Sequence, residues 1–211
     1  MKIRFYLSGV IVAMVISVSA SAQTATHVMN NMVNMMKNNA IKTNFGLVIK
    51  EAGATNLHTM GGTFLMKGEK FTFNTDEMQV YYDGKTQWSY MPGINEVSIT
   101  APTEKELAQT NPLALLQAYS SKSTIRYFKN NSAKNAYSVE LIPKDKSSDI
   151  GRIQVVIDKK TYYPQTIQLA DKKGMISTLA LTKFQKGVKT DEKTFTFNSS
   201  VYKDIEINDL R

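Results

Sequence analysis

The chain contains no cysteine and only two histidines among its 211 residues. Without cysteine it cannot form disulfides, a zinc finger or a thiol nucleophile, and it cannot carry a lipidated N-terminal cysteine. The two histidines, His27 and His58, are far apart in the sequence. This spacing argues against a histidine-rich metal site, although sites built from carboxylates stay open.

Familiar catalytic motifs are also missing. The sequence has no GxSxG, HExxH, P-loop or GxGxxG pattern. Most acidic residues, such as Asp76, Asp83 and Asp171, fall at expected turns or strand ends, where solvation explains them. We therefore expect no catalytic residues, no cofactor and no metal. An enzyme would require a solvent-reachable cluster of carboxylates or tyrosines with shifted pKa values.

The charge is positive but dispersed. Lys and Arg number 26 against 18 Asp and Glu, which gives a net charge of +8, and 42% of residues are apolar. This composition excludes a disordered chain and a polytopic membrane protein. The basic residues form no stripe of the kind that binds nucleic acid, so we expect no nucleic-acid partner. A solvated surface explains them; transient contact with anionic lipid headgroups is the alternative.

The N-terminus has the form of an export signal. Lys2 and Arg4 precede an apolar run from Phe5 to Ala20, and Ala20-Ser21-Ala22 has the small-x-small pattern of a cleavage site. The run is shorter than the roughly 20 residues that a membrane-spanning helix needs. We therefore expect residues 1–22 to be a cleaved signal peptide and residues 23–211 to form a single domain.

An amphipathic helix is expected at the start of the mature chain. Its apolar residues recur at a spacing of four: Val28, Met32, Met36 and Ala40. Thr26 could cap its start. Because methionine is flexible and polarizable, a methionine-rich stripe suits a surface that adapts to variable shapes, although ordinary core packing explains it too.

From Thr43 onward the apolar period changes to two, which predicts β-strands. Met60–Ile99 reads as an antiparallel meander, in which Asp83-Gly84 favours a two-residue type I′ hairpin turn. We count about eleven strands in the chain and no βαβ rhythm. Further strands are predicted at Ile125–Lys129, Tyr137–Ile142, Ile153–Ile157, Thr166–Ala170, Ile176–Phe184, Phe195–Phe197 and Ile205–Ile207.

Two short helices are expected between the strands. Thr103 and Glu106 have the spacing of a capping box. Asn111-Pro112 would end that helix and start another, which carries Leu113 and Leu116. These helices could cover a sheet face as a lid or could be a routine connector.

The fold class follows from the apolar face of so large a sheet, which must be buried. We predict a mainly β protein: a single large antiparallel sheet curled into an unclosed (half) barrel, with the N-terminal helix and the short mid-chain helices covering its concave face. A reversible lid would create a pocket for an apolar ligand. The candidate cavity wall is Phe64, Phe71, Phe73, Tyr82, Trp88 and Tyr90. The candidate lid is Met29, Met32, Met36, Leu113 and Leu116.

Plain core packing is the alternative for each of these residues. If the cavity assignment holds, Phe71→Glu or Trp88→Glu should abolish ligand loading while export persists. Normal loading by well-folded variants would argue against the assignment.

Several of these motifs resemble those of the periplasmic lipoprotein carriers of the LolA family. The strongest is Asp83-Gly84-Lys85-Thr86-Gln87-Trp88-Ser89-Tyr90, which is similar to the family pattern Asp-Gly-x-x-x-Trp-x-Tyr. The segments Gly61-Gly62-Thr63-Phe64 and Phe71-Thr72-Phe73, the insert at Asn111-Pro112 and the tail Lys193-Thr194-Phe195-Thr196-Phe197 also resemble it. The likeness extends over the whole mature chain.

The resemblance implies an incompletely closed barrel with a helical lid over an apolar cavity. It implies a monomeric periplasmic carrier whose cargo is acylated lipoproteins, taken from an inner-membrane ABC transporter and passed to an outer-membrane acceptor. The family's acceptor is itself a lipoprotein, so a chain without cysteine resembles the soluble carrier.

One position departs from the family. Where the family has the arginine of Lys-Arg-Pro, linked to closing the lid, this chain has Gly68. This departure leaves open a carrier or sensor of another lipid or apolar ligand on the same scaffold. An interaction module with a filled core is a further alternative.

Overall fold

The computed structural model describes residues 23–131 and 133–211, so the predicted signal peptide lies outside the described residues. The helical elements are α1 (Ala25–Lys37), α2 (Glu104–Thr110), α3 (Pro112–Ser120), η1 (Glu192–Phe195) and η2 (Ser199–Val201). The strands are β1 (Ala40–Lys50), β2 (Leu57–Lys67), β3 (Lys70–Asn74), β4 (Gln79–Tyr82), β5 (Gln87–Met91), β6 (Glu96–Thr100), β7 (Ser123–Tyr127), β8 (Ala136–Pro143), β9 (Ile150–Asp158), β10 (Pro164–Asp171), β11 (Ile176–Lys186) and β12 (Glu206–Asp209).

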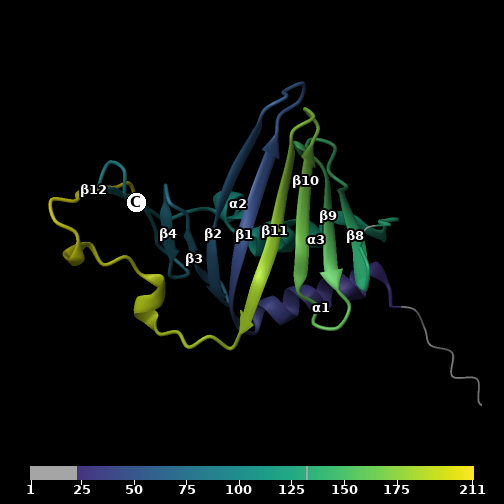
Figure 1. Cartoon of the computed structure of the whole chain (residues 1–211), viewed down its shortest axis with the longest axis horizontal. Helices are drawn as coiled ribbons and strands as arrows, with labels where there is room; N and C mark the ends of the chain where they lie inside the picture. The colour runs from purple at the N-terminus through teal and green to yellow at the C-terminus, as the bar shows by residue number, and fades with distance from the viewer. Residues whose placement is uncertain (1–22, 132) are drawn as a thin grey trace, which may run out of the picture.

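All twelve strands belong to one curved sheet. Their order is β12-β6-β5-β4-β3-β2-β1-β11-β10-β9-β8-β7, so that β12 and β7 are the two edges (Figure 1). The predicted unclosed sheet is therefore confirmed. Neighbouring strands are antiparallel except β12 and β6, which run parallel. The C-terminal segment, yellow in Figure 1, leaves the foot of β11 and reaches the far edge of the sheet before it forms β12.

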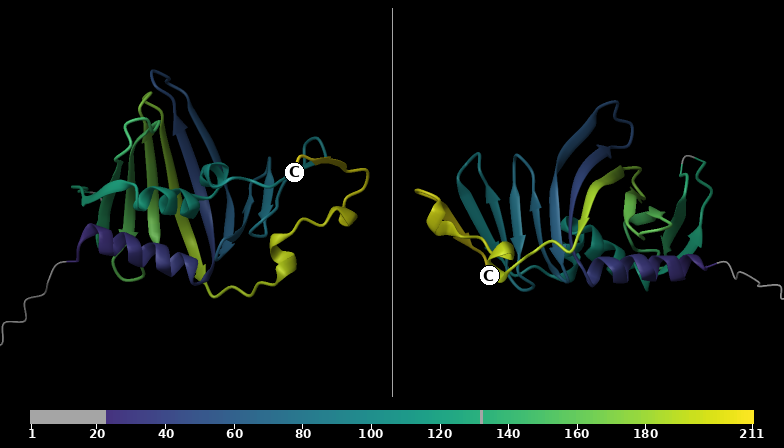
Figure 2. Two further views of the ribbon diagram at one scale, coloured as in Figure 1. Left: turned by 180° about the vertical axis from the view of Figure 1, so that it is seen from behind. Right: turned by 60° about the horizontal axis from the view of Figure 1, so that its bottom comes forward.

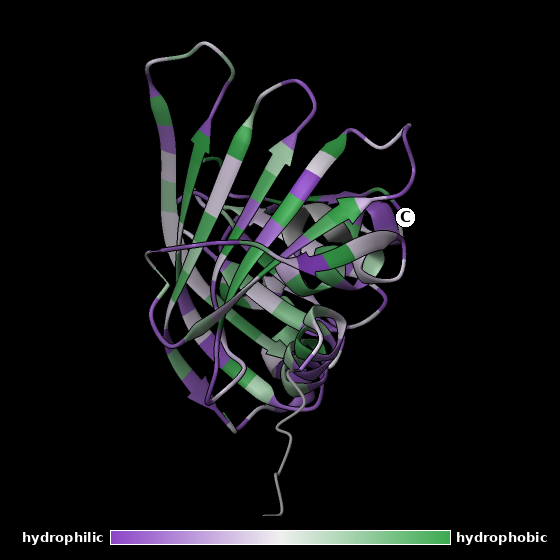
Figure 3. Cartoon of the chain, turned by 90° about the vertical axis from the view of Figure 1, so that its right-hand side faces the viewer, coloured by the Kyte–Doolittle hydropathy of each residue, from purple (hydrophilic) through white to green (hydrophobic). Residues whose placement is uncertain are grey.

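The helices α1, α2 and α3 lie on one side of this sheet. The right-hand view of Figure 2 shows α1 across the open side of the curve. It packs against α3 and against β1, β7 and β8, and α3 packs against β7 and β8 as well. Hydropathy alternates along many of the strands, as Figure 3 shows, because successive side chains point to opposite faces. The helices cover the face of the sheet that carries the main apolar core.

The caps of α1 and α2 are built differently from each other. α2 has the predicted capping box: Glu106 Oε2 accepts a hydrogen bond from the Thr103 amide at 2.7 Å, and hydrogen bonds from Thr103 lower the pKa of Glu106. For α1 the prediction of Thr26 as cap was wrong. Thr24 is the cap, because it has extended backbone angles and its Oγ1 accepts from the His27 amide at 3.2 Å.

The predicted β4–β5 hairpin is confirmed, but its turn differs from the predicted type I′ turn at Asp83-Gly84. The Asp83 amide donates to the Thr86 carbonyl at 3.2 Å, so Gly84 and Lys85 are the two central residues. Gly84 has φ +101°, whereas Lys85 is not in the left-handed region that a type I′ turn also needs at its second position. The Asp83 carboxylate accepts from the Lys85 and Thr86 amides and stabilises the turn.

The predicted strand Phe195–Phe197 was also wrong. Residues 192–195 form η1, a short 3-10 helix. The Asp191 carboxylate accepts from the Thr194 amide at 2.9 Å, and the Thr194 hydroxyl accepts from the Asp191 amide. This capping box overrides the alternating apolar pattern that follows it.

Gly62→Ala is expected to lower the free energy of unfolding by about 1–3 kcal/mol. A Cβ at residue 62 would lie 2.0 Å from the Asn74 carbonyl oxygen and 2.9 Å from the Phe45 ring. The Phe45 ring is itself stacked on Phe73, with centroids 4.7 Å apart, so it cannot move aside without losing this contact. Urea unfolding measures the effect. The control is Gly46→Ala in β1, where nothing lies within 4 Å of the added carbon; equal losses for both variants would contradict the packing argument.

Candidate functional site

Four of the six predicted wall residues share the concave face. Side chains of directly paired residues in neighbouring strands point to the same side of a sheet. Phe64 pairs with Phe73, and Phe71 pairs with Tyr82. The rings of Phe64 and Phe71 are 5.7 Å apart, and those of Phe71 and Tyr82 are 5.4 Å apart. Together they form a continuous aromatic wall over β2, β3 and β4.

The structure does not bring Trp88 and Tyr90 together with those four. Trp88 pairs with Tyr81, the neighbour of Tyr82, and therefore points to the convex face. The sequence carried a signal for this. A two-residue hairpin loop pairs residues whose numbers differ by an odd amount, whereas Tyr82 and Trp88 are an even number apart. Any two-residue loop here separates these two side chains onto opposite faces.

On the convex face, the C-terminal segment covers the sheet with aromatic rings. Tyr90 lies 5.3 Å from Phe197 and 4.5 Å from Tyr202, measured between ring centroids. Tyr81 contacts Phe197 edge-on at 5.7 Å, and burial raises the pKa of the Tyr81 hydroxyl. Tyr90 is thus a core residue of a second, smaller apolar layer, distinct from the concave face.

The predicted lid residues are all brought onto the concave face. Met29, Met32 and Leu116 are completely buried, and Met36 and Leu113 are nearly so. They belong to the same apolar core as Phe64, Phe71 and Tyr82. The lid in this structure is therefore part of the same core as the wall, and its own side chains contribute to filling the concave side.

Sequence reasoning missed part of the wall. Phe45 on β1 lies in the same core and stacks on Phe73. Ile41 and Met66 are paired and fully buried in the same core. The signal was the alternation Ile41, Thr43, Phe45, Leu47 along β1, which places all four side chains on one face.

A groove lies where the lid meets the wall. It has a volume of about 460 Å³ and runs between the β2–β3 turn and the helices α2 and α3. Tyr82 of the wall and Leu113 of the lid both line it. Its full lining is Gly68, Glu69, Tyr82, Pro102, Glu104, Leu107, Asn111, Leu113, Ala114, Gln117, Ala118, Ser121 and Lys122.

Gly68 has a local structural role at one end of this groove. Lys67 pairs with Lys70, so Gly68 is the first central residue of a two-residue turn. Its φ of +63° is the left-handed conformation that glycine adopts without strain. Nothing lies within 4 Å of a Cβ built at this position. The groove therefore has no side chain at this turn position.

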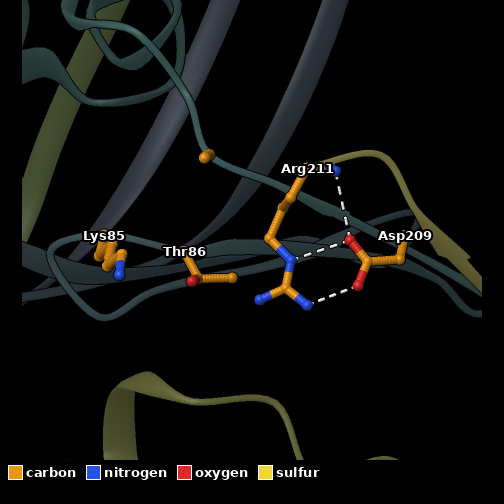
Figure 4. Close-up of a pocket in the computed structure, with 5 residues that line it drawn as sticks. Lys85, Thr86, Asp209 and Arg211 are labelled. Carbon is orange, nitrogen blue, oxygen red and sulfur yellow. Dashed lines mark hydrogen bonds and ion pairs between the residues drawn. The ribbon is translucent and has the colours of Figure 1, made fainter.

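A second hollow, of about 470 Å³, lies at the β12 edge of the sheet (Figure 4). It is lined by Lys85, Thr86, Ala101, Asp209 and Arg211. Arg211 Nε donates to Asp209 Oδ1 at 2.8 Å, and these hydrogen bonds lower the pKa of Asp209 to about 2. This hollow is open and charged, so it does not suit an acyl chain.

Asn111→Ala is expected to lower the free energy of unfolding by about 0.5–2 kcal/mol. The buried Asn111 Oδ1 accepts from the Leu113 amide at 2.9 Å and from the Ala114 amide at 3.3 Å, which caps α3. Asn111→Asp keeps the acceptor and serves as the matched control. Urea unfolding curves measure both variants; equal stability of the alanine variant and the native protein would show that the cap contributes nothing.

The part of the chain that the structure describes lacks both a candidate metal cluster and a helix suited to crossing a membrane. No group of three or more His, Cys, Asp and Glu side chains is placed to hold a metal ion. No helix within residues 23–131 and 133–211 has the length and hydropathy that crossing a membrane requires.

Comparisons with known proteins agree with this geometry. The sequence model of the family described as outer membrane lipoprotein carrier protein LolA matches residues 16–173. An outer-membrane lipoprotein carrier protein of Photobacterium profundum is 29% identical over 177 residues, covering 82% of this chain and 84% of the relative. The corresponding protein of Vibrio parahaemolyticus is 30% identical over 169 residues, covering 78% and 76%.

A solved structure is similar in fold. It is an uncharacterized conserved protein from Thermus thermophilus, with a TM-score of 0.57 at 10% sequence identity. The alignment covers 86% of this chain and 96% of that one. At so low an identity the likeness extends to the fold alone.

Proposed function

Because the chain belongs to the LolA family of outer-membrane lipoprotein carrier proteins, we propose that it binds the acyl chains of lipoproteins against the concave face of its sheet and carries them across the periplasm. The observation that supports this most is the burial of the methionine-rich α1 in the apolar core of the concave side, which also contains Phe64 and Phe71. Met29, Met32 and Met36 occupy the position that acyl chains would take.

Loading is then an exchange of contacts. The lid gives up its place in the core that it shares with Phe64 and Phe71, and acyl chains replace it. Such an exchange requires two states that differ by a few kcal/mol, so that cargo shifts the population toward the open one. Methionine suits this role because it packs well against chains of varied shape. The groove between Tyr82 and Leu113 is where a first acyl chain would begin to separate lid from wall.

Extraction of a lipoprotein from the membrane requires a donor that supplies energy. A buried CH₂ group contributes about 0.8 kcal/mol to membrane anchoring, so two or three long acyl chains hold a lipoprotein by roughly tens of kcal/mol. Non-covalent affinities level off near roughly −18 to −21 kcal/mol. The carrier therefore receives its cargo from an inner-membrane ABC transporter that does work, and it passes the cargo to an acceptor at the outer membrane. It functions as a monomer, and this role needs no catalytic residue.

The test is a gentle purification of the tagged mature protein from its own periplasm, followed by mass spectrometry of what accompanies it. Acylated lipoproteins in a roughly one-to-one complex are expected. A native mass that shows the protein empty under all conditions, with no shift of melting temperature on adding a diacylated lipopeptide, would overturn the proposal and favour an interaction module with a filled core.

A second candidate is a carrier or sensor of another lipid. Gly68 favours it, because the resemblance implies an arginine at this turn, whereas the groove here has no side chain at that position. Free lipid recovered without lipoproteins in the same purification would support this candidate over the first.

A further inference from the structure

Three tyrosines stand together beside the start of α1. Tyr127 ends β7, Tyr137 lies in β8, and Tyr162 lies in the turn between β9 and β10. The rings of Tyr127 and Tyr137 are stacked with centroids 6.3 Å apart, and those of Tyr137 and Tyr162 are 6.2 Å apart. We refer to Tyr127, Tyr137 and Tyr162 as the tyrosine row.

All three hydroxyls of the tyrosine row donate to one residue, Gln23. Tyr127 Oη donates to the Gln23 main-chain carbonyl oxygen at 2.6 Å. Tyr137 Oη and Tyr162 Oη donate to the side-chain oxygen Oε1 at 3.2 and 3.0 Å. The side-chain amide oxygen of Gln23 thus has two hydroxyl donors, and every one of these contacts ends on an oxygen atom.

Tyr162 is held in this row by a strained backbone. Its φ of +58° lies in the left-handed region, where hairpins of this kind favour glycine. The turn is fixed by the Asp158 carboxylate, which accepts from the Lys160 and Thr161 amides, and the Tyr162 amide donates to the Asp158 carbonyl at 3.0 Å. A bulky aromatic residue rarely adopts this conformation, and such backbone strain is concentrated at functional sites. The conformation therefore indicates a functional role for the Tyr162 side chain.

Gln23 is also the residue that would begin the mature chain. The pattern Ala20-Ser21-Ala22 predicts cleavage just before it. A free α-ammonium there would lie at the positive end of the α1 dipole, and the first turn of α1 contains no acidic residue. One cationic side chain also lies beside the row: Lys159 Nζ is 5.5 Å from the centre of the Tyr137 ring. A neutral N-terminus suits this environment better.

We propose that the tyrosine row is a modification site that converts the N-terminal Gln23 into pyroglutamate and then holds the ring. The neutral α-amino nitrogen attacks the side-chain carbon Cδ and forms the new C–N bond. The C–Nε2 bond breaks, and Nε2 leaves as ammonia with the proton that the α-nitrogen gives up. No oxidant, cofactor or second substrate takes part. The inference rests on export and cleavage, and it is independent of what cargo the protein carries.

The geometry of the hydrogen bonds fits this reaction. Negative charge develops on Oε1 when the α-nitrogen attacks, and Tyr137 and Tyr162 already donate to that oxygen. The two atoms that the reaction changes, the α-nitrogen and Nε2, are not the ones bound by the row. Both oxygen atoms of Gln23 remain in the lactam product, so the acceptors of all three hydrogen bonds are kept. Burial raises the pKa of the Tyr127 hydroxyl above its ordinary value.

The first measurement is the intact mass and the N-terminal peptide of the exported protein. We expect a chain that begins at residue 23 and lacks the mass of one ammonia. Gln23→Asn is the control, because its shorter side chain cannot close a five-membered ring; it should keep its ammonia and melt at a lower temperature. A free glutamine at the N-terminus, or a mature chain that begins at another residue, would overturn the proposal.

The second measurement is the rate of ring closure. A fusion cut by a protease directly before residue 23 supplies folded protein with a fresh N-terminal glutamine, and a synthetic peptide of residues 23–32 supplies the intrinsic rate. We expect the folded chain to close about tenfold faster, less than the hundredfold effect of a donor in a water-excluded site, because Gln23 is exposed. Tyr137→Phe and Tyr162→Phe should slow it toward the peptide rate.

Tyr163→Phe is the matched control for the rate, since Tyr163 stacks on Phe184 rather than joining the row. A folded chain that closes no faster than the peptide, or a Tyr137→Phe/Tyr162→Phe double variant as fast as the native chain, would show that the row only anchors the residue. Failure in these tests leaves cargo loading unaffected, so it is distinguishable from failure of the proposed carrier function.

Discussion

Phe73→Glu is expected to abolish cargo loading, whereas Trp88→Glu is expected to keep loading within about twofold of the native protein. Both side chains are partly buried aromatics of the same sheet. Phe73 stacks on Phe45 in the concave wall, while Trp88 pairs with Tyr81 on the convex face. A carboxylate in the wall must lose its hydration when an acyl chain covers it, at a cost of several kcal/mol.

The measurement is capture of a diacylated lipopeptide by each purified variant, with circular dichroism and thermal melting to establish that both are folded. Because Phe73 and Trp88 are both partly exposed, a glutamate at either position is compatible with a folded protein. Phe71 is fully buried, so a glutamate there would destabilise the fold. The structure thus revises the expectation that the sequence raised for Trp88. Equal loss of loading in the two variants would contradict the assignment of cargo binding to the concave face.

Leu116→Ala is expected to have two effects of opposite sign. It should lower the free energy of unfolding by about 2–5 kcal/mol, because the lid residue Leu116 is fully buried in the core and its truncation leaves a cavity. It should also raise the affinity for an apolar ligand, because the closed lid that competes with the ligand loses contacts. Urea unfolding gives the first quantity, and titration with a fluorescent acyl probe gives the second.

Leu210→Ala is the control for this variant, since Leu210 is 65% exposed near the C-terminus, away from the lid. It should change neither quantity appreciably. A Leu116→Ala protein that is destabilised yet binds the probe more weakly than the native chain would contradict the competition between lid and ligand. Leu116 would then belong to the binding surface rather than to a competitor.

Periodicity in the sequence sufficed for the fold because each long element has a clear pattern. The four-residue spacing of Val28, Met32 and Met36 defined α1 and its buried face, and all three are buried. Alternation defined the strands, and the capping box at Thr103 and Glu106 located α2. The ends of the helices and strands were harder to predict, because short polar contacts decide them. Thr24 rather than Thr26 caps α1, and Asp191 caps a 3-10 helix at residues 192–195, where a strand was predicted to begin.

The candidate site was harder to predict than the fold. Alternation shows that two faces exist, but which aromatic residues share a face depends on how each hairpin turn pairs its strands. Tyr82 and Trp88 look alike in the sequence, yet the turn at Gly84 and Lys85 places them on opposite faces. The convex face is apolar near β5 because Phe197 and Tyr202, distant in sequence, cover it. The alternation of apolar residues within one strand cannot show that a segment distant in the sequence packs against that strand.

The most direct test of the central claim, that acyl cargo replaces the lid on the concave face, is photo-crosslinking of a loaded complex. A photoreactive phenylalanine derivative is placed at Phe73 in one protein and at Trp88 in another, and each is loaded with the same diacylated lipopeptide. The account predicts crosslinks to the acyl chains from position 73 and none above background from position 88. Crosslinks from position 88, or equal yields from both positions, would contradict it.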